Sequence, residues 1–262
     1  MLTKEQLKKS IDKYGDSSKL VSRLGITEEE VTETVVLAPW WHPNKLYNNF
    51  DCKIELLSDE FPDVHRITYN NKSFLHIRSY VGATNVGETV LLLSFTKCKR
   101  IIFVGSIGSI SNDVNIGDLI IPSTSVSGES FSSYMYETIN KDSIHKEYYP
   151  TRELYDITTN YLNNENIDYK DIKVYSVDTI AGQFSHIDEI LNLGCKAIEM
   201  ETSALFSSCQ VVEKECVALL AVSDNTILNK SLISGRTDED MGLYHKTRYI
   251  IIPKIIFKLV GL

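Results

Sequence analysis

Polar residues follow three apolar runs of this 262-residue chain, at the points where buried strands would end. The three segments are IIFVGSIG (101–108), AIEME (197–201) and CVALLAVSDN (216–225). Ligands of an open α/β sheet bind at the carboxyl ends of its strands. We therefore predict that the polar residues of the three segments meet around one small-molecule ligand.

The glycine pair Gly105 and Gly108 fits no phosphate-binding motif by itself. Its spacing differs from the G-x-x-x-x-G-K-[ST] loop, and the third glycine of the dinucleotide fingerprint is missing. The stretch is also one residue short of the G-x-S-x-G elbow that carries the nucleophile of serine hydrolases. Taken alone, the pair predicts a tight exit from a strand, where the backbone passes close to a ligand.

Glu199 and Glu201 flank Met200 where a strand would give way to a helix. The pair fits a helix start, because the helix dipole stabilises carboxylates near the N-terminus. If the strand continues through them, alternation places both carboxylates on one face. They would then be able to accept hydrogen bonds from a vicinal diol such as ribose. The pattern leaves both interpretations open.

Asp224 follows a long apolar strand and also has two interpretations. It could cap the segment that follows it, since Asp is a favoured N-cap residue. Alternatively, a carboxyl half-desolvated in a cleft has a raised pKa and donates a proton near neutrality. Trp40 and Trp41 could likewise stack on a ring ligand, but we favour a packing role for at least one of them.

Strands and helices alternate along most of the chain. Expected strands lie at 35–38, 64–69, 73–79, 100–104, 118–121, 172–178 and 216–223, and expected helices at 151–164, 185–194, 202–213 and the C-terminus. This order predicts an α/β protein with three layers, α/β/α, and a mixed central sheet. Capping boxes at Thr3 and Thr27 predict two short helices, so we expect a helical N-terminal extension over 1–34 before a single domain over 35–262.

Composition narrows the class of protein. The net charge of −8 argues against a nucleic-acid surface or an anionic membrane as partner. No apolar stretch reaches the roughly 18 residues of a membrane span. The five cysteines include no C-x-x-C pair, which suits reduced thiols in a cytoplasm. The six histidines lack metal-ligand spacing, so we expect no metal site.

Four segments together resemble the nucleoside phosphorylase superfamily, which contains hexameric purine nucleoside phosphorylases, uridine phosphorylases and methylthioadenosine nucleosidases. VVLAP (35–39) resembles the first strand, and the segment 101–121 resembles V-G-[ST]-x-G…G-D-[LIV]. AIEMETSALF (197–206) resembles the ribose motif V-E-M-E-[ATS]-[AS], and AVSDN (221–225) resembles the base motif [VI]-S-D-[HN]. The order and spacing of the four segments also match those of the superfamily.

The resemblance implies cleavage of the N-glycosidic bond of a nucleoside. Glu201 would bind the ribose hydroxyls above Met200, and Asp224 would protonate the leaving base with help from Arg236. Gln183 is similar to the uracil-reading glutamine of uridine phosphorylases, but that branch lacks the Ser-Asp pair, so we rank purine bases first. The remaining substrate-binding residues implied by the resemblance are Gly105, Ser106, Ile107, Gly108, Ile180, Ile198, Glu199 and Ser223.

The acceptor of the ribosyl group is less clear from the sequence. Purine phosphorylases have a phosphate-binding arginine at the position of Phe103, and their G-D-P-x-R turn is replaced here by residues 41–45. Lys45 and Arg78 are the candidates to replace these cations, together with Ser106. We rank phosphate first as acceptor and co-substrate, with no other cofactor.

Two other activities stay open. Nucleosidases place a water-activating glutamate after the first strand, where this chain has His42. Hydrolysis is therefore the alternative to phosphorolysis. The third hypothesis is a protein that binds a nucleoside or nucleotide without turnover. The resemblance also implies a homo-oligomer, either a dimer or a hexamer.

Overall fold

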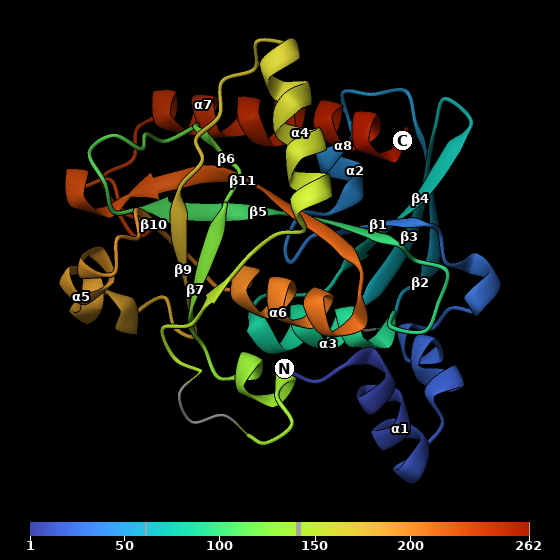
Figure 1. The fold of residues 1–262 in the computed structure, drawn as a ribbon. Helices are drawn as coiled ribbons and strands as arrows, with labels where there is room; N and C mark the ends of the chain where they lie inside the picture. The colour runs from blue at the N-terminus through green and yellow to red at the C-terminus, as the bar shows by residue number, and fades with distance from the viewer. Residues whose placement is uncertain (61, 140–142, 262) are drawn as a thin grey trace.

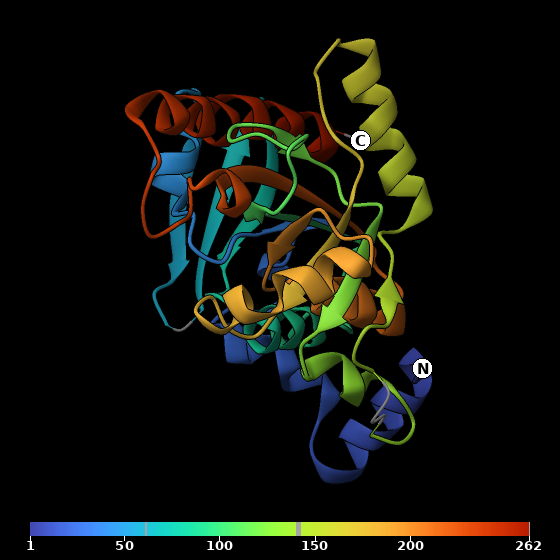
Figure 2. The ribbon, with the colours of Figure 1, turned by 90° about the vertical axis from the view of Figure 1, so that its left-hand side faces the viewer.

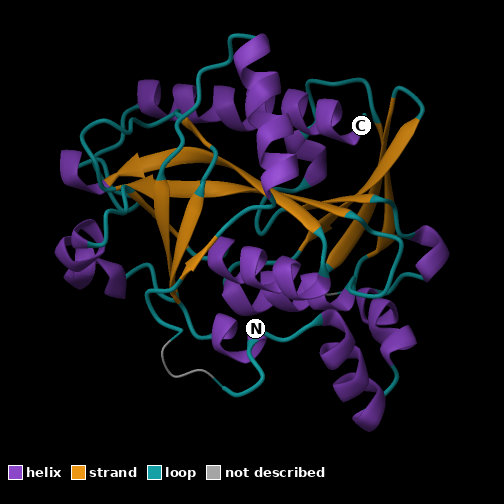
Figure 3. Cartoon of the chain, viewed as in Figure 1, coloured by secondary structure: helices purple, strands orange, loops and turns teal. Residues whose placement is uncertain are grey.

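A computed structural model describes residues 1–60, 62–139 and 143–261. It contains a mixed sheet with helices packed on both faces, which confirms the predicted fold class (Figures 1 and 3). Along one path the strand order is β2-β3-β4-β1-β5-β10-β9-β7-β8, and β11 pairs with both β5 and β6. The pairing is parallel between β1, β4 and β5 and antiparallel between β5 and β10.

The strands are β1 (Thr34–Leu37), β2 (Lys53–Ser58), β3 (Asp63–Tyr69), β4 (Lys72–Arg78), β5 (Arg100–Ser109), β6 (Leu119–Ile120), β7 (Thr124–Gly128), β8 (Glu147–Tyr148), β9 (Lys173–Val177), β10 (Ala197–Glu199) and β11 (Glu215–Asn225). The α-helices are α1 (Lys4–Tyr14), α2 (Pro43–Leu46), α3 (Ala83–Leu92), α4 (Arg152–Asn164), α5 (Ile187–Asn192), α6 (Thr202–Val212), α7 (Asp238–Lys246) and α8 (Ile252–Val260). The shorter helical segments are η1 (Ser17–Leu24), η2 (Glu28–Glu30), η3 (Phe131–Met135), η4 (Gly182–His186), η5 (Thr226–Leu228) and η6 (Thr247–Ile251).

Two apolar layers separate the sheet from its helices. On one face, α3 and α6 bury residues such as Val90 and Phe206 against the strands. On the other face, α4 and α8 bury Leu162 and Ile255. Figure 2 shows the two layers from the side, with the C-terminal helices on one side of the sheet and the N-terminal segment on the other. None of the described helices is long and apolar enough to cross a membrane.

The N-terminal segment packs onto the main core. Both predicted capping boxes form, at Thr3 and at Thr27. Val21 and Leu24 of η1 are buried in the same apolar cluster as Val90 of α3. Residues 1–33 therefore cover one helical layer, and the predicted division into an extension and a domain stays a prediction.

Several elements lie where the local sequence pattern predicted them. The hairpin between β3 and β4 turns at Asn70 and Asn71, whose φ angles of 48° and 62° suit a tight hairpin turn. The sequence predicts none of the strands β2, β7 and β8. Two expected elements also differ in form. The stretch 105–108 is not a loop, because β5 continues to Ser109 while pairing with β11 along its whole length. The long C-terminal helix is interrupted by a π-helical turn, η6.

Candidate active site

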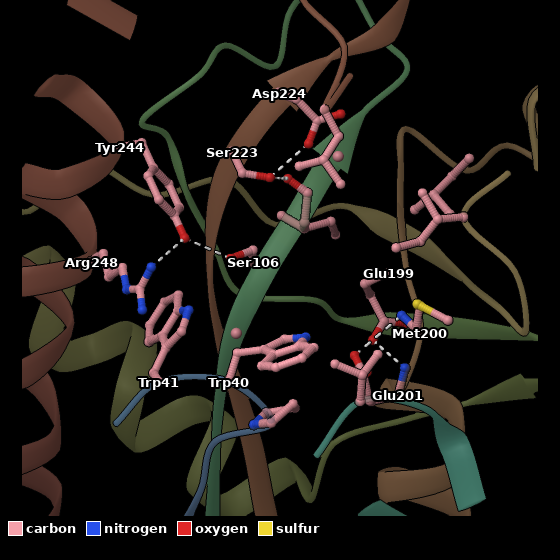
Figure 4. A pocket seen from close by; sticks show the side chains of 18 of the residues that line it. Trp40, Trp41, Ser106, Glu199, Met200, Glu201, Ser223, Asp224, Tyr244 and Arg248 are labelled. Atoms are coloured by element: carbon pink, nitrogen blue, oxygen red, sulfur yellow. Dashed lines mark hydrogen bonds between the residues drawn. The ribbon is translucent and has the colours of Figure 1, made fainter. Parts of the chain in front are cut away.

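A cavity of about 370 Å³ opens at the ends of β5, β10 and β11, a size typical of small-molecule sites (Figure 4). All of the predicted catalytic and substrate-binding residues line it: Gly105, Ser106, Ile107, Gly108, Ile180, Gln183, Ile198, Glu199, Met200, Glu201, Ser223, Asp224 and Arg236. The lining also includes Pro39, Trp40, Trp41, Val81, Leu232, Tyr244 and Arg248. The three predicted groups of polar residues therefore meet at one cavity.

A β-bulge in β11 places Asp224 opposite the glycine stretch. Val222 pairs with Ile107, and Asp224 pairs with Gly108, so Ser223 is the extra residue. Bulges redirect side chains and often lie beside active sites. A Cβ atom on Gly108 would lie 3.0 Å from Oδ2 of Asp224, so the absence of a side chain at Gly108 makes room for this carboxylate.

The surroundings of Asp224 favour its protonated form. Burial raises the pKa of Asp224, while a hydrogen bond from the Ser223 hydroxyl at 2.6 Å and the nearby Arg236 guanidinium oppose this increase. Arg236 donates hydrogen bonds to the backbone oxygens of Ser223 and Leu232 and so holds the following loop against the bulge. A buried carboxyl of this kind can donate a proton to a ligand near neutral pH.

The two glutamates have different roles. The strand ends at Glu199, whose carboxylate accepts hydrogen bonds from the backbone N–H groups of Glu201 and Thr202, both at 2.7 Å. The hydroxyls of Ser176 and Thr202 donate to its other oxygen. Glu199 therefore stabilises the start of α6, as the helix-start interpretation predicted, and has little capacity left for a ligand.

Glu201 keeps acceptor capacity for the cavity. Its Oε1 accepts the backbone N–H of Gly82 at 2.8 Å, and its Oε2 accepts the backbone N–H of Met200 at 3.3 Å. Burial and the neighbouring Glu199 raise the pKa of Glu201. A carboxylate oxygen has two lone pairs, so Glu201 can accept further hydrogen bonds from the hydroxyls of a ligand.

Two tryptophans border the cavity in different ways. Trp41 is 2% exposed and Trp40 is 67% exposed, so only Trp41 has the packing role that we expected for at least one of them. The guanidinium of Arg248 lies 4.7 Å from the ring centre of Trp41. Next to it, the Tyr244 hydroxyl lies 2.7 Å from the Ser106 hydroxyl. Tyr244 and Arg248 come from the C-terminal helical region, and no sequence motif identified them.

Comparison with known proteins identifies the family. Residues 47–239 match the model of the family described as the phosphorylase superfamily. The chain belongs to this superfamily. Among its relatives, a DeoD-type purine nucleoside phosphorylase from Bacillus velezensis is 24% identical over 163 residues, which is 61% of this chain and 67% of the relative.

The names of the relatives describe two activities, phosphorylase and nucleosidase. A 5′-methylthioadenosine/S-adenosylhomocysteine nucleosidase from Staphylococcus haemolyticus is 23% identical over 225 residues, covering 78% of this chain and 94% of the relative. The structure of purine nucleoside phosphorylase from Toxoplasma gondii in complex with immucillin-H has the same fold, with a TM-score of 0.72 at 16% identity over 90% of this chain and 92% of that one. Membership of the superfamily thus supports nucleoside chemistry and leaves phosphate and water both open as acceptors.

The phosphate cations predicted for this superfamily member do not line the cavity. Lys45 is exposed on α2, and Arg78 pairs with Asp63 at 2.8 Å between β3 and β4. Phe103 is fully buried in the core, beside Gly105. Asp63 already holds Arg78, and Lys45 lies away from the cavity lining, so neither residue replaces the missing arginine as we predicted. The cations that do line the cavity within the described residues are Arg236 and Arg248.

One group of residues has the composition of a metal site. Ligand atoms of His42, Asp63 and His65 lie within 4.8 Å of one another. The guanidinium of Arg78 donates to Asp63 there and so already supplies a positive charge to this carboxylate. That the protein functions without a bound metal therefore stays a prediction.

Proposed function

We propose that this chain cleaves the N-glycosidic bond of a purine-type nucleoside and transfers the ribosyl group to phosphate. The observation that carries the proposal is that Glu201 and Asp224, from separate strand ends, line the same cavity. One carboxylate suits the sugar and the other suits the base, and the cavity between them has the volume of a small-molecule site.

The ribose would lie at Glu201. The two backbone N–H groups that donate to its carboxylate fix its position, and its remaining lone pairs would accept hydrogen bonds from the ribose hydroxyls. Met200 would pack under the sugar, and Ile198 would supply an apolar surface for the base. A ribose held in this way keeps its anomeric carbon in place while the bond to the base lengthens.

The base would leave toward Asp224. As the bond between the anomeric carbon and the ring nitrogen breaks, its electron pair moves into the purine, and Asp224 donates its proton to a nitrogen of the five-membered ring. A phosphate oxygen forms the new bond to the anomeric carbon, which gives ribose 1-phosphate and the free base. Asp224 then regains a proton from solvent. General acid catalysis of this kind contributes on the order of 10² to 10⁴ in rate.

Hydrolysis is the second candidate, and the buried Phe103 favours it because this strand position supplies no cation for phosphate. Against hydrolysis, the carboxylates that line the cavity within the described residues are Glu199, Glu201 and Asp224. Each of them already has a structural, sugar-binding or base-directed role, so none is left over to activate water.

Release of free base from a panel of purine and pyrimidine nucleosides, with and without phosphate, tests the proposal. Purine release that requires phosphate is the expected result, and release that ignores phosphate would establish the hydrolase. Thermal stabilisation by nucleosides without any release would leave a binding protein. We also propose a homo-oligomer, with the exposed Trp40 beside the cavity available to a second copy, and light scattering coupled to gel filtration measures its size.

A further inference from the structure

We infer that Ser106, Tyr244 and Arg248 form an anion subsite of the cavity and that the group bound there is a phosphate. The inference rests on the proposed function for the identity of the substrate. Figure 4 shows the three residues together on one side of the cavity, with Glu201 and Met200 on the other. The subsite is therefore separate from the sugar-binding carboxylate.

Aromatic rings hold the guanidinium of Arg248 in place. It lies 4.7 Å from the ring centre of Trp41, 4.8 Å from that of Tyr249 and 5.8 Å from that of Tyr244. Its Nη1 donates a hydrogen bond to the Tyr244 hydroxyl at 3.2 Å. A guanidinium ordered in this way recognises a phosphate with little further loss of side-chain entropy.

Among the residues that the structure describes, no counter-ion balances the charge of Arg248. Arg78, Arg100 and Arg152 each pair with a carboxylate. No carboxylate of the described residues forms an ion pair with Arg248, and its buried Nε lacks a hydrogen-bond acceptor there. A partly buried cation is unfavourable unless an anion compensates it. An anionic ligand in the cavity would supply this compensation.

The two hydroxyls provide a further donor. Arginine only donates, so the Tyr244 oxygen accepts from Arg248. Tyr244 and Ser106 have one proton each, and one of these protons closes the 2.7 Å hydrogen bond between them. The second hydroxyl proton has no acceptor among these three residues. Since Ser106 is exposed to the cavity, this spare O–H can donate to a ligand oxygen.

The backbone around Arg248 is also unusual. Arg248 lies in η6, a π-helical turn between α7 and α8. Such turns are rare and occur frequently at functional sites. A guanidinium beside a hydroxyl donor matches the tetrahedral oxygens of phosphate. Two sources supply this group, namely free inorganic phosphate as the ribosyl acceptor and the 5′-phosphate of a nucleoside monophosphate.

Titration calorimetry of the full chain with inorganic phosphate tests the subsite without requiring turnover. We expect Arg248→Met to weaken phosphate binding at least about 10-fold and Arg248→Lys to restore part of it. Tyr244→Phe should weaken it less. The matched control is Arg152→Met, because Arg152 is an exposed arginine outside the cavity and should leave phosphate binding unchanged. Thermal unfolding of each variant checks that it is folded.

The same titrations separate the two sources. If free phosphate is the ligand, adenosine and phosphate bind together, and adenosine 5′-monophosphate gains no affinity over adenosine through Arg248. If the ligand is a 5′-phosphate, the monophosphate binds more tightly than adenosine, phosphate competes with it, and Arg248→Met removes the difference. If neither phosphate nor the monophosphate binds, or if both bind Arg248→Met as they bind the unmodified chain, the inference is wrong.

Base release, measured separately, distinguishes this inference from the proposed function. Purine release from nucleosides and from nucleoside 5′-monophosphates that is unaffected by phosphate and by Arg248→Met would overturn the anion subsite and leave glycosidic cleavage intact. Phosphate binding that depends on Arg248, without base release from any nucleoside, would overturn the proposed function and leave the subsite intact.

Discussion

The carboxylate of Glu201 accepts the backbone N–H of Gly82 at 2.8 Å, which joins the turn before α3 to the turn before α6. Gly82 has a φ of 102°, a conformation that favours glycine. This contact fixes one oxygen of Glu201 and orients the rest of the carboxylate toward the cavity. The sugar-binding role proposed for Glu201 therefore depends on two distant segments at once.

Glu201→Gln should weaken the binding of ribonucleosides. A hydrogen bond contributes about 0.5–1.5 kcal/mol, so KM for a ribonucleoside should rise by up to roughly 10-fold. The 2′-deoxynucleoside has one hydroxyl fewer and should lose less. Steady-state kinetics on both substrates measure the difference, with the exposed Glu153→Gln as control. Equal losses for the two sugars would mean that Glu201 does not contact the 2′-hydroxyl.

Asp224→Asn should lower kcat on the order of 10² to 10⁴-fold while nucleoside binding changes little. Because burial raises the pKa of Asp224, the carboxyl keeps its proton to higher pH than an ordinary aspartate. Activity of the unmodified enzyme should then fall as pH rises through this raised pKa, and the residual activity of the variant should lack that alkaline decline. Base release across pH and calorimetry at one pH measure both effects. A variant that loses binding and turnover equally would indicate a structural role.

Gly108→Ala tests whether the Asp224 carboxylate needs the space left by the missing side chain at Gly108. The added Cβ would lie 3.0 Å from Oδ2 of Asp224 and would displace the carboxylate by a few tenths of an ångström. Small displacements of catalytic groups reduce rate strongly, so we expect at least about a 10-fold loss of kcat/KM with a nearly unchanged melting temperature. Gly242→Ala is the control, since nothing lies within 4 Å of its added Cβ. Full activity of Gly108→Ala would show that the carboxylate tolerates the shift.

Phe103→Arg should not create a phosphate site. The Phe103 side chain is fully buried among apolar residues, and β5 pairs there with Leu37 and Ala218 on its two neighbouring strands. An unpaired buried charge would lower the free energy of unfolding by on the order of 3 kcal/mol or more. Urea unfolding compares it with Phe103→Leu, which removes volume without adding charge. A stable Phe103→Arg variant with tighter phosphate binding would contradict this arrangement.

His76 should make the protein sensitive to acid. It is buried between the Trp41 backbone oxygen and the Tyr47 hydroxyl, and burial lowers the pKa of His76 to about 3. Between this value and the usual pKa of about 6.5, the unfolded chain binds a proton that the folded chain does not. Stability should therefore fall as pH falls through this window, by up to about 1.4 kcal/mol per pH unit.

Urea unfolding at pH 7 and pH 4.5 measures this effect. His76→Gln should flatten the pH dependence, although His65, whose pKa is also lowered by burial, retains part of it. The exposed His186→Gln should leave the slope unchanged. An unchanged slope in His76→Gln would show that other groups cause the acid sensitivity.

The central part of the site could be predicted from the sequence because each piece of it is local. The polar residues at 105–108 and 223–225 lie at the ends of β5 and β11, which run parallel and so end together. The residues at 199–201 join them because β10, although antiparallel to β5, pairs with it at Gly108. The spacing of Glu199 and Glu201 could not separate their roles, because the exact end of β10 decides which carboxylate turns inward.

The anion side of the cavity could not be predicted in the same way. Tyr244 and Arg248 lie in a helical stretch whose pattern indicates only packing against the sheet. Their approach to Ser106 depends on tertiary packing of the C-terminal helices over β5 and on the π-helical turn. Arg78 looked available because it lies at the end of a strand, and only the structure reveals its pairing with Asp63.

A π-helical turn shifts the angular frame of a helix by the equivalent of one inserted residue. Because η6 separates α7 from α8, Arg248 can turn toward the cavity while Ile252, Ile255 and Leu259 keep their apolar stripe on the sheet. Deletion of one residue within Thr247–Ile251 would restore one continuous α-helical frame. Arg248 could then no longer face the cavity while the apolar residues of α8 face the sheet. Such a deletion would move the guanidinium proposed for the anion subsite while leaving the sheet and the carboxylates Glu201 and Asp224 in place.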